Sequence, residues 1–186
     1  MKAYTERVLC WFALPCTGGC PFARMNARKN HKAKQRLEGH INLFSLLWEN
    51  AVTVMKEAKI WKSLTAFEWP TFCAYWQREE VWEHMREMEY SFVDFHGCMF
   101  GLQSIAKSTK GWPIKKPWSV ATDCAPLLRT LNRKCLGYWH HDPATGKKQA
   151  HAECAGVNTK MTEGYTDEMA KAIHRGHREC ILYGNR

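Results

Sequence analysis

The sequence predicts an α/β domain in which a mostly parallel sheet is flanked by helices. Three observations lead to this fold class. Short apolar segments rich in β-forming residues alternate with longer segments of helical periodicity along the first 124 residues. The chain of 186 residues is long enough for one domain with a core and too short for two ordinary domains. Hydrophobic residues make up 45% of the chain and aromatic residues 12%, which is enough to fill that core.

Each element of the first 124 residues follows from a local pattern. The run VLCWFAL is apolar and ends abruptly at Pro15, as a buried strand does where it enters a tight loop. The run LTAFEW is similar and stops at Pro70. Between them, apolar residues recur every three or four positions, which predicts a long amphipathic helix. The predicted strands cover residues 8–14, 64–69, 91–95 and 118–122, and the predicted helices cover 36–59 and 78–89.

Beyond residue 124, Cys and His together are more frequent, and much of the sequence has little periodicity. We therefore divide the sequence into an α/β catalytic-like domain, 1–124, and a Cys/His-rich segment, 125–186, that packs on the same domain. A short helix over 125–134 leads into a loop over 137–164. Thr166 then has the features of an N-cap, with two acidic residues in the first turn of a final helix. So long a loop implies that a metal or a partner orders it.

Charge and cysteine content indicate where the protein works and what it binds. The 27 Lys and Arg residues exceed the 18 Asp and Glu residues, giving a net charge of +9 that suits a polyanionic partner such as nucleic acid. The charge does not distinguish the two nucleic acids; we expect DNA more than RNA. Nine scattered cysteines do not resemble a secreted disulfide framework. Glu6 and Arg7 interrupt the start where a signal peptide would be apolar, and no run is long enough to span a membrane. We expect an intracellular protein without a membrane partner.

Two reactive side chains come just after neighbouring predicted strands. Cys16 follows the first strand, and Glu68 stands at the end of the second. Ligands of open α/β sheets bind at the carboxyl ends of the strands. We therefore expect a thiol nucleophile beside an acid in one pocket.

These motifs, in this order, resemble the cytosine-5 DNA methyltransferases, most closely the divergent methylases of phages and mobile elements. The similar features come in the family's order. They are a Pro-Cys loop after a strand, a helix, a strand ending in Glu, a Cys-containing turn, a Lys-Pro strand, and a tail that contains Cys and His. The resemblance covers about residues 8–175. Its motifs are ALPCTGGCPF (13–22), FEWP (67–70), FHGCMFG (95–101), KKPWSVATD (115–123), and Cys135 with His140, His141 and His151.

The resemblance implies a Rossmann-like class I methyltransferase half-fold and a role for each pocket residue. Cys16 would add to carbon 6 of a flipped cytosine, and Glu68 would contact ring nitrogen 3. Pro15 and Thr17 would contact the methyl donor S-adenosylmethionine. Two features depart from the family: Trp69 stands where Asn usually follows the Glu, and the Gly-rich donor-binding half has no counterpart before Cys16. We expect the chain to need a separate or upstream cofactor-binding half, and to be incomplete or inactive alone.

Basic residues cluster in two places that could contact phosphates. One place follows the Pro-Cys loop, and the other precedes the fourth predicted strand. The six candidates are Arg24, Arg28, Lys29, Lys32, Lys115 and Lys116.

The Cys/His-rich segment carries ligand types suited to zinc. Its candidates are Cys135, His140, His151 and Cys154, at Cys-x4-His and His-x2-Cys spacings. Cys20, close to Cys16, is a further ligand candidate.

Three other functions compete with the methyltransferase. The chain could be a noncatalytic nucleic-acid-binding module of a mobile element, with a zinc-ordered tail. Asp94 with Glu68 could form a metal-dependent nuclease. His96, at a strand end, could serve Cys16 in a Cys-His hydrolase.

Overall fold

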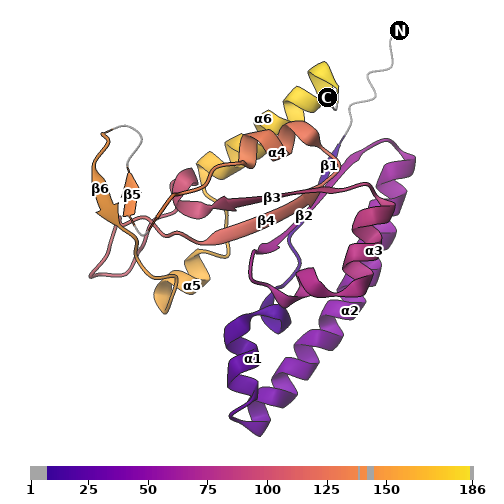
Figure 1. The fold of residues 1–186 in the computed structure, drawn as a ribbon. Coiled ribbons are helices and arrows are strands. Elements are labelled where there is room, and N and C mark those ends of the chain that lie inside the picture. The colour runs from indigo at the N-terminus through magenta and orange to yellow at the C-terminus, as the bar shows by residue number, and fades with distance from the viewer. Residues whose placement is uncertain (1–7, 138, 142–144, 185–186) are drawn as a thin grey trace.

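A four-stranded mixed sheet lies between two layers of helices in the computed structural model of the chain (Figure 1). The structure describes residues 8–137, 139–141 and 145–184. Glu6 and Arg7, which argue against a signal peptide, lie outside these ranges. The α/β fold class is confirmed.

The strands are β1 (Leu9–Phe12), β2 (Leu64–Pro70), β3 (Ser91–His96) and β4 (Pro117–Thr122), in the spatial order β1-β2-β4-β3. β1 pairs with β2 in parallel, whereas β4 is antiparallel to both of its neighbours. The expectation of a mostly parallel sheet is therefore wrong for the pairings, and the sheet is mixed. Because β4 alone is reversed, β1, β2 and β3 still point in one direction.

The reversal of β4 has a local cause. A parallel neighbour requires a crossover connection of a dozen or more residues, usually containing an α-helix. Residues 97–116 between β3 and β4 contain a 3-10 turn, Gly97–Phe100, and two isolated bridges, Gln103 with Pro113 and Ile114 with Ala152, but no α-helix. The chain therefore folds back, and β4 enters the sheet from the edge where β3 ends.

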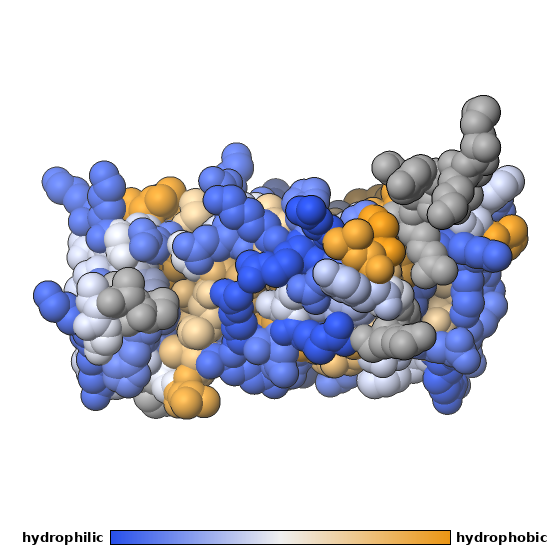
Figure 2. Space-filling model, turned by 90° about the horizontal axis from the view of Figure 1, so that it is seen from above, coloured by the Kyte–Doolittle hydropathy of each residue, from blue (hydrophilic) through white to orange (hydrophobic). Residues whose placement is uncertain are grey.

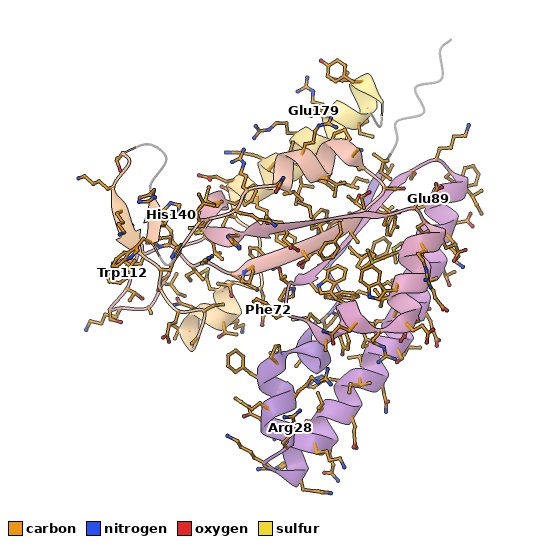
Figure 3. All side chains as sticks on the ribbon, viewed as in Figure 1. Arg28, Phe72, Glu89, Trp112, His140 and Glu179 are labelled. Carbon is orange, nitrogen blue, oxygen red and sulfur yellow. The ribbon has the colours of Figure 1, made fainter. Side chains whose placement is uncertain are left out.

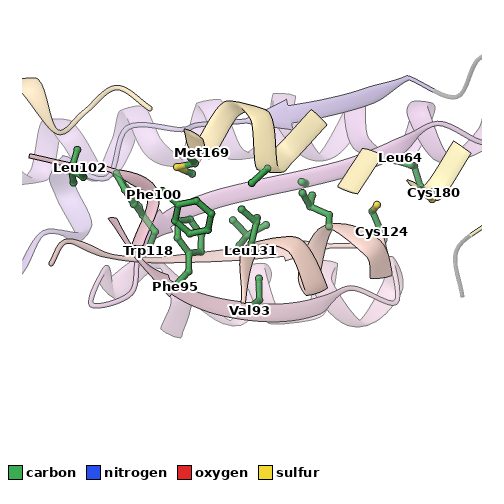
Figure 4. Close-up of a cluster of buried hydrophobic side chains, with 14 of the residues drawn as sticks. Leu64, Val93, Phe95, Phe100, Leu102, Trp118, Cys124, Leu131, Met169 and Cys180 are labelled. Atoms are coloured by element: carbon green, nitrogen blue, oxygen red, sulfur yellow. The ribbon is translucent and has the colours of Figure 1, made fainter. Parts of the chain in front are cut away.

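Each face of the sheet is covered by its own pair of helices (Figure 1). Helices α2 (His31–Ile60) and α3 (Glu79–Glu87) pack on one face, with Phe44, Trp48 and Phe67 in the core. Helices α4 (Ala125–Leu131) and α6 (Asp167–Tyr183) cover the other face. The second core contains Phe95, Phe100, Trp118, Leu131 and Met169 (Figure 4). Residues beyond 124 thus belong to the same packed unit as the sheet.

The first long helix begins earlier than its apolar periodicity predicts. The side chain of Asn30 accepts hydrogen bonds from the backbone N–H groups of Lys32 (2.8 Å) and Ala33 (3.3 Å), so α2 starts at His31. Its first turn is largely exposed and carries no apolar stripe, which hides it from a periodicity search. A short helix, α1 (Pro21–Ala27), also forms where we expected only a basic stretch.

The predicted loop over 137–164 contains regular structure. A small hairpin pairs β5 (Trp139–His141) with β6 (Lys148–Ala150), and the short helix α5 (Val157–Met161) follows. The N-cap at Thr166 is confirmed, because its Oγ1 accepts a hydrogen bond from the Met169 N–H at 3.2 Å.

The surface above α4 and α6 is mainly hydrophilic, with apolar atoms in separate patches (Figure 2). No helix within the described ranges is both long and apolar enough to cross a bilayer. All nine cysteines are free thiols.

The packing of α6 against α4 depends on a glycine. A Cβ at Gly176 would lie 2.7 Å from the Leu127 Cα, a backbone atom that cannot move aside cheaply, whereas a Cβ at Gly39 in α2 would meet nothing within 4 Å. Gly176→Ala should therefore lower the free energy of unfolding by about 1–3 kcal/mol through overpacking. Gly39→Ala should raise it by roughly 0.5–1 kcal/mol, because Ala favours the helix. Urea unfolding of both variants checks this, and equal effects would contradict the close helix contact.

Candidate functional site

One edge of the sheet gathers most of the chemistry-bearing residues. β1, β2 and β3 end there, and the reversed β4 begins there. The edge therefore receives Cys16 after β1, Glu68 near the end of β2, and Lys116 just before β4. The sequence-predicted thiol and acid are close enough to interact, because the Glu68 carboxyl is one of the groups that raise the pKa of the Cys16 thiol.

Glu68 is a buried acid with one free oxygen. Its side chain is 8% exposed, and its Oε1 accepts a hydrogen bond of 2.8 Å from the Tyr165 hydroxyl. The Trp11 Nε1–H in turn donates to the Tyr165 oxygen at 2.9 Å. Within the described part of the chain, Glu68 Oε2 is buried without a hydrogen-bond partner. Such an orphan acceptor is uncommon in a folded protein and marks a place where a ligand can bind.

Burial raises the pKa of the Glu68 carboxyl, although the Tyr165 hydrogen bond and the nearby Lys116 ammonium act in the opposite direction. The net effect is a raised pKa, so Glu68 keeps its proton to a higher pH than an ordinary carboxyl group does. A neutral carboxyl group can donate a hydrogen bond from Oε2, which an ionised one cannot. The site thus favours a ligand with an acceptor at that position.

Cys16 is half-buried in the loop after β1. Burial raises the pKa of its thiol, and the positive charge of Lys116 is the main opposing influence. The Lys116 Nζ donates to the Thr162 carbonyl and lies 4.7 Å from the Trp118 ring centroid, so its position is fixed. Lys116, expected as a phosphate contact, therefore lies beside the thiol and the acid.

Trp69 ties the Pro-Cys loop to the sheet. Its Nε1–H donates a 3.0 Å hydrogen bond to the Leu14 carbonyl, two residues before Cys16. Trp69 itself is 1% exposed and packs against Trp76 and Phe67. The residue that departs from the methyltransferase pattern thus supplies a hydrogen bond that links β2 to the loop.

The cavity beside Pro15 and Thr17 is too small to hold S-adenosylmethionine. Pro15 and Thr17 are exposed and line a cavity of about 10 Å³, which is room for one water molecule. The following glycines pack tightly, since a Cβ at Gly19 would lie 2.4 Å from the Cys73 sulfur. The expectation that Pro15 and Thr17 hold the methyl donor is not supported by this geometry, and we derive no methyl-transfer step.

The nuclease pairing is wrong. The sheet register places Glu68 opposite Val120 and Asp94 opposite Ser119, and neighbouring residues of a strand face opposite sides of a sheet. Asp94 therefore lies on the opposite face from Glu68, where its Oδ1 accepts a hydrogen bond from Ser119. His96 is also engaged elsewhere, because its Nδ1 accepts a 2.8 Å bond from the Cys135 N–H.

A second group at the same end of the molecule could hold a metal ion. The ligand atoms of Cys98, Cys135, His140 and His151 all lie within 4.8 Å of one another, and the Cys135 sulfur is 3.5 Å from His151 Nε2. Three of these residues are predicted by the sequence. His140 is buried in β5, away from the helices α1 and α2 (Figure 3).

The fourth predicted ligand is wrong. Cys154 is exposed and lies outside the group, with its sulfur 3.2 Å from the Thr162 hydroxyl oxygen. Cys98 takes the place instead, from the 3-10 turn after β3. It stands 37 residues before Cys135, so no local spacing identifies it; only its position at a strand end does. Cys20, the other candidate ligand, is absent from the group.

The predicted phosphate contacts divide into two surfaces. Four of them are exposed on α1 and the start of α2, which project away from the sheet, as Arg28 shows (Figure 3). They are Arg24, Arg28, Lys29 and Lys32. Lys115 and Lys116 lie just before β4, at the end of the sheet where β1, β2 and β3 end.

Comparison of the chain with protein-family models, curated proteins and solved structures found no match.

The raised pKa of Glu68 predicts a pH dependence of stability. Below the ordinary value of 4.5, the carboxyl is protonated in both folded and unfolded chains. As the pH rises above that value, the unfolded chain loses its proton first, so the free energy of unfolding falls until the folded carboxyl also ionises. Glu68→Gln mimics the neutral acid and escapes this loss.

The melting temperature of Glu68→Gln should therefore exceed that of the wild type at neutral pH and approach it near pH 4. Thermal unfolding at several pH values measures the difference. Gln at the exposed Glu163 is the control and should show no such trend. A difference independent of pH would contradict the buried, neutral carboxyl.

Proposed function

We propose that the chain is a cytosine-5 methyltransferase-type domain that binds an unstacked pyrimidine of nucleic acid between Cys16 and Glu68. The observation that carries the proposal is the buried Glu68 carboxyl, held by Tyr165 on one oxygen and free on the other, at the same sheet edge as the thiol. Ring nitrogen 3 of cytosine is an acceptor that fits the neutral acid.

The sheet supports the same assignment. Three codirectional strands with helices on both faces are compatible with half of a Rossmann-like sheet, and the reversed β4 is a departure from the mostly parallel pattern. In that half-fold the Pro-Cys loop follows the first of these strands, and the acid follows on the second. Cys16 and Glu68 stand at those two positions.

The reaction we assign to these residues needs no methyl donor. The Cys16 thiol loses its proton to solvent, aided by the Lys116 charge, and the sulfur bonds to carbon 6 of the base. The C5=C6 electron pair shifts to form a C4=C5 bond and the C4=N3 pair shifts onto nitrogen 3, which takes the proton of Glu68 and leaves Glu68 as a carboxylate. Water supplies a proton to carbon 5. In the reverse direction carbon 5 releases its original hydrogen to water, nitrogen 3 returns its proton to the Glu68 carboxylate, and the sulfur–carbon bond breaks with its electron pair leaving on the Cys16 sulfur. The net change is hydrogen exchange at carbon 5.

Release of tritium from a single-stranded oligonucleotide labelled at cytosine carbon 5 tests this reaction. Cys16→Ser should abolish the release, and Glu68→Gln should reduce it by roughly 10²–10⁴-fold, as expected for loss of a general acid. Cys20→Ser, at a half-buried cysteine four residues away, should leave it unchanged. No release by the wild type, or equal release by Cys16→Ser, would refute the nucleophile.

We further propose that the Cys98, Cys135, His140 and His151 group binds structural zinc. Two sulfur and two imidazole ligands form a common structural zinc set, in which ligand atoms are about 3.4–3.8 Å apart, so the group needs only a small contraction. This observation also favours the second candidate function, a zinc-ordered nucleic-acid-binding module without catalysis. Zinc in that role fixes the β5–β6 hairpin and supplies no chemistry to Cys16.

The zinc assignment predicts which cysteine matters. Purified protein should contain one zinc per chain, and Cys98→Ser should weaken zinc binding at least about 100-fold, more than loss of an outer-shell partner does. Cys154→Ser should retain the metal, because this thiol lies outside the group. Metal analysis and chelator competition measure both. Loss of zinc in Cys154→Ser with retention in Cys98→Ser would contradict the ligand set.

A further inference from the structure

Two hollows meet beside Trp139, at the end of the sheet that carries the Cys/His group. One has a volume of about 390 Å³ and the other about 760 Å³, and Gly137 and Trp139 line both. Volumes of this size suit a ligand of a few hundred daltons or a segment of a larger one. Neither hollow is lined by Cys16 or Glu68.

The lining of the hollows is basic and aromatic. The Trp139 side chain is 49% exposed, and the Lys148 Nζ lies 4.9 Å from its ring centroid. Lys134 and Lys148 line the first hollow and Lys115 lines the second, and no acidic side chain is among the described lining residues. Asp94, 3.8 Å from the Lys134 Nζ, partly neutralises that lysine, so Lys115 and Lys148 contribute most.

The backbone of Trp139 lies next to the Cys/His group. Trp139 directly precedes His140, and its carbonyl oxygen lies 3.5 Å from the Cys135 sulfur. An aromatic ring in a fixed backbone, surrounded by lysines, is the arrangement that single-stranded nucleic acid binds, because bases stack on the ring and phosphates pair with the ammonium groups.

Lys115 and Lys116 connect this groove to the pocket. Adjacent residues in extended chain point in opposite directions. Lys116 faces Thr162 and the Cys16–Glu68 pair, whereas Lys115 lines the hollow beside Trp139. A strand whose base enters the pocket would therefore have its neighbouring nucleotides within reach of the groove.

We propose that the groove around Trp139 binds the unpaired nucleotides that flank the base held by Cys16 and Glu68. This inference names the substrate of the proposed function, an unpaired segment of nucleic acid. It rests on the proposed function only for the identity of the base that Cys16 and Glu68 hold. The groove itself requires nothing of the thiol. Binding and reaction can therefore be tested separately.

The test measures the affinity of fluorescently labelled single-stranded DNA and RNA of one sequence, and of the matching duplex, for the zinc-loaded protein. Trp139→Ala should weaken single-strand binding about 5- to 150-fold, the value of one stacked base, and Trp139→Phe should restore most of it. Lys115→Ala and Lys148→Ala should each reduce the slope of log affinity against log salt by about 0.7. Trp82→Ala, at an equally exposed tryptophan of α3, is the matched control and should bind normally.

The same titrations in a Cys16→Ser background separate the two proposals. Weaker binding by the Trp139→Ala double variant, without tritium release by any protein, would support the groove and refute the nucleophile. Tritium release by the wild type, with equal single-strand affinity for Trp139→Ala and Trp82→Ala, would refute the groove. Tighter binding of the duplex, indifferent to Trp139, would also refute it. Zinc content and circular dichroism confirm that each variant is folded.

Discussion

The reversed direction of β4 is the constraint on which the arrangement of this protein depends. Were β4 parallel to its neighbours, the residues before it would lie at the opposite edge of the sheet from the ends of β1, β2 and β3. Because it is antiparallel, Lys115 and Lys116 lie beside the Pro-Cys loop, the end of β2 and the Cys98 turn. Thiol, acid, ammonium groups and the Cys/His group thus share one edge.

Much of the fold follows from local pattern. The strand starting at Leu64 and the N-cap at Thr166 were predicted within a residue or two. An apolar run that ends at a proline and a polar cap before a helix are both patterns of adjacent residues. The direction of β4 is not local. It depends on whether residues 97–116 form a crossover helix, and the alternating strand and helix pattern before them favoured a parallel continuation.

In the candidate site, too, the residues in local motifs were predicted and the long-range contacts were not. Cys16 and Glu68 were predicted from motifs at strand ends, and three of the four ligands of the Cys/His group from their residue types. Tyr165, which binds Glu68, stands 97 residues away in the sequence, and Cys98 stands 37 residues before Cys135. Only the packing of residues beyond 124 on the sheet brings such pairs together, so no spacing rule could identify them. The role of Trp69 could not be predicted either, because no sequence pattern indicates its hydrogen bond to the Leu14 carbonyl.

Two features of the edge cost stability, and each is better explained by a ligand than by folding. Burying the Glu68 carboxyl with one oxygen unpaired is unfavourable, and an apolar residue at this position would pack between Ala66 and Val120 without that penalty. The half-exposed ring of Trp139 gains little from its position in a two-stranded hairpin, which is marginal by itself.

A single flexible polyanion could contact both the Glu68 carboxyl and the Trp139 ring. Removing a base from a duplex costs a few kcal/mol, and the cost falls when the neighbouring nucleotides are already unpaired. A protein that holds those neighbours by stacking and charge therefore stabilises the state in which the base can enter a pocket. In the proposed function, the adjacent Lys115 and Lys116 would join these two operations, and a metal ion bound by the Cys/His group would fix the backbone that carries the Trp139 ring. In this view the buried acid and the exposed ring are two halves of one recognition surface.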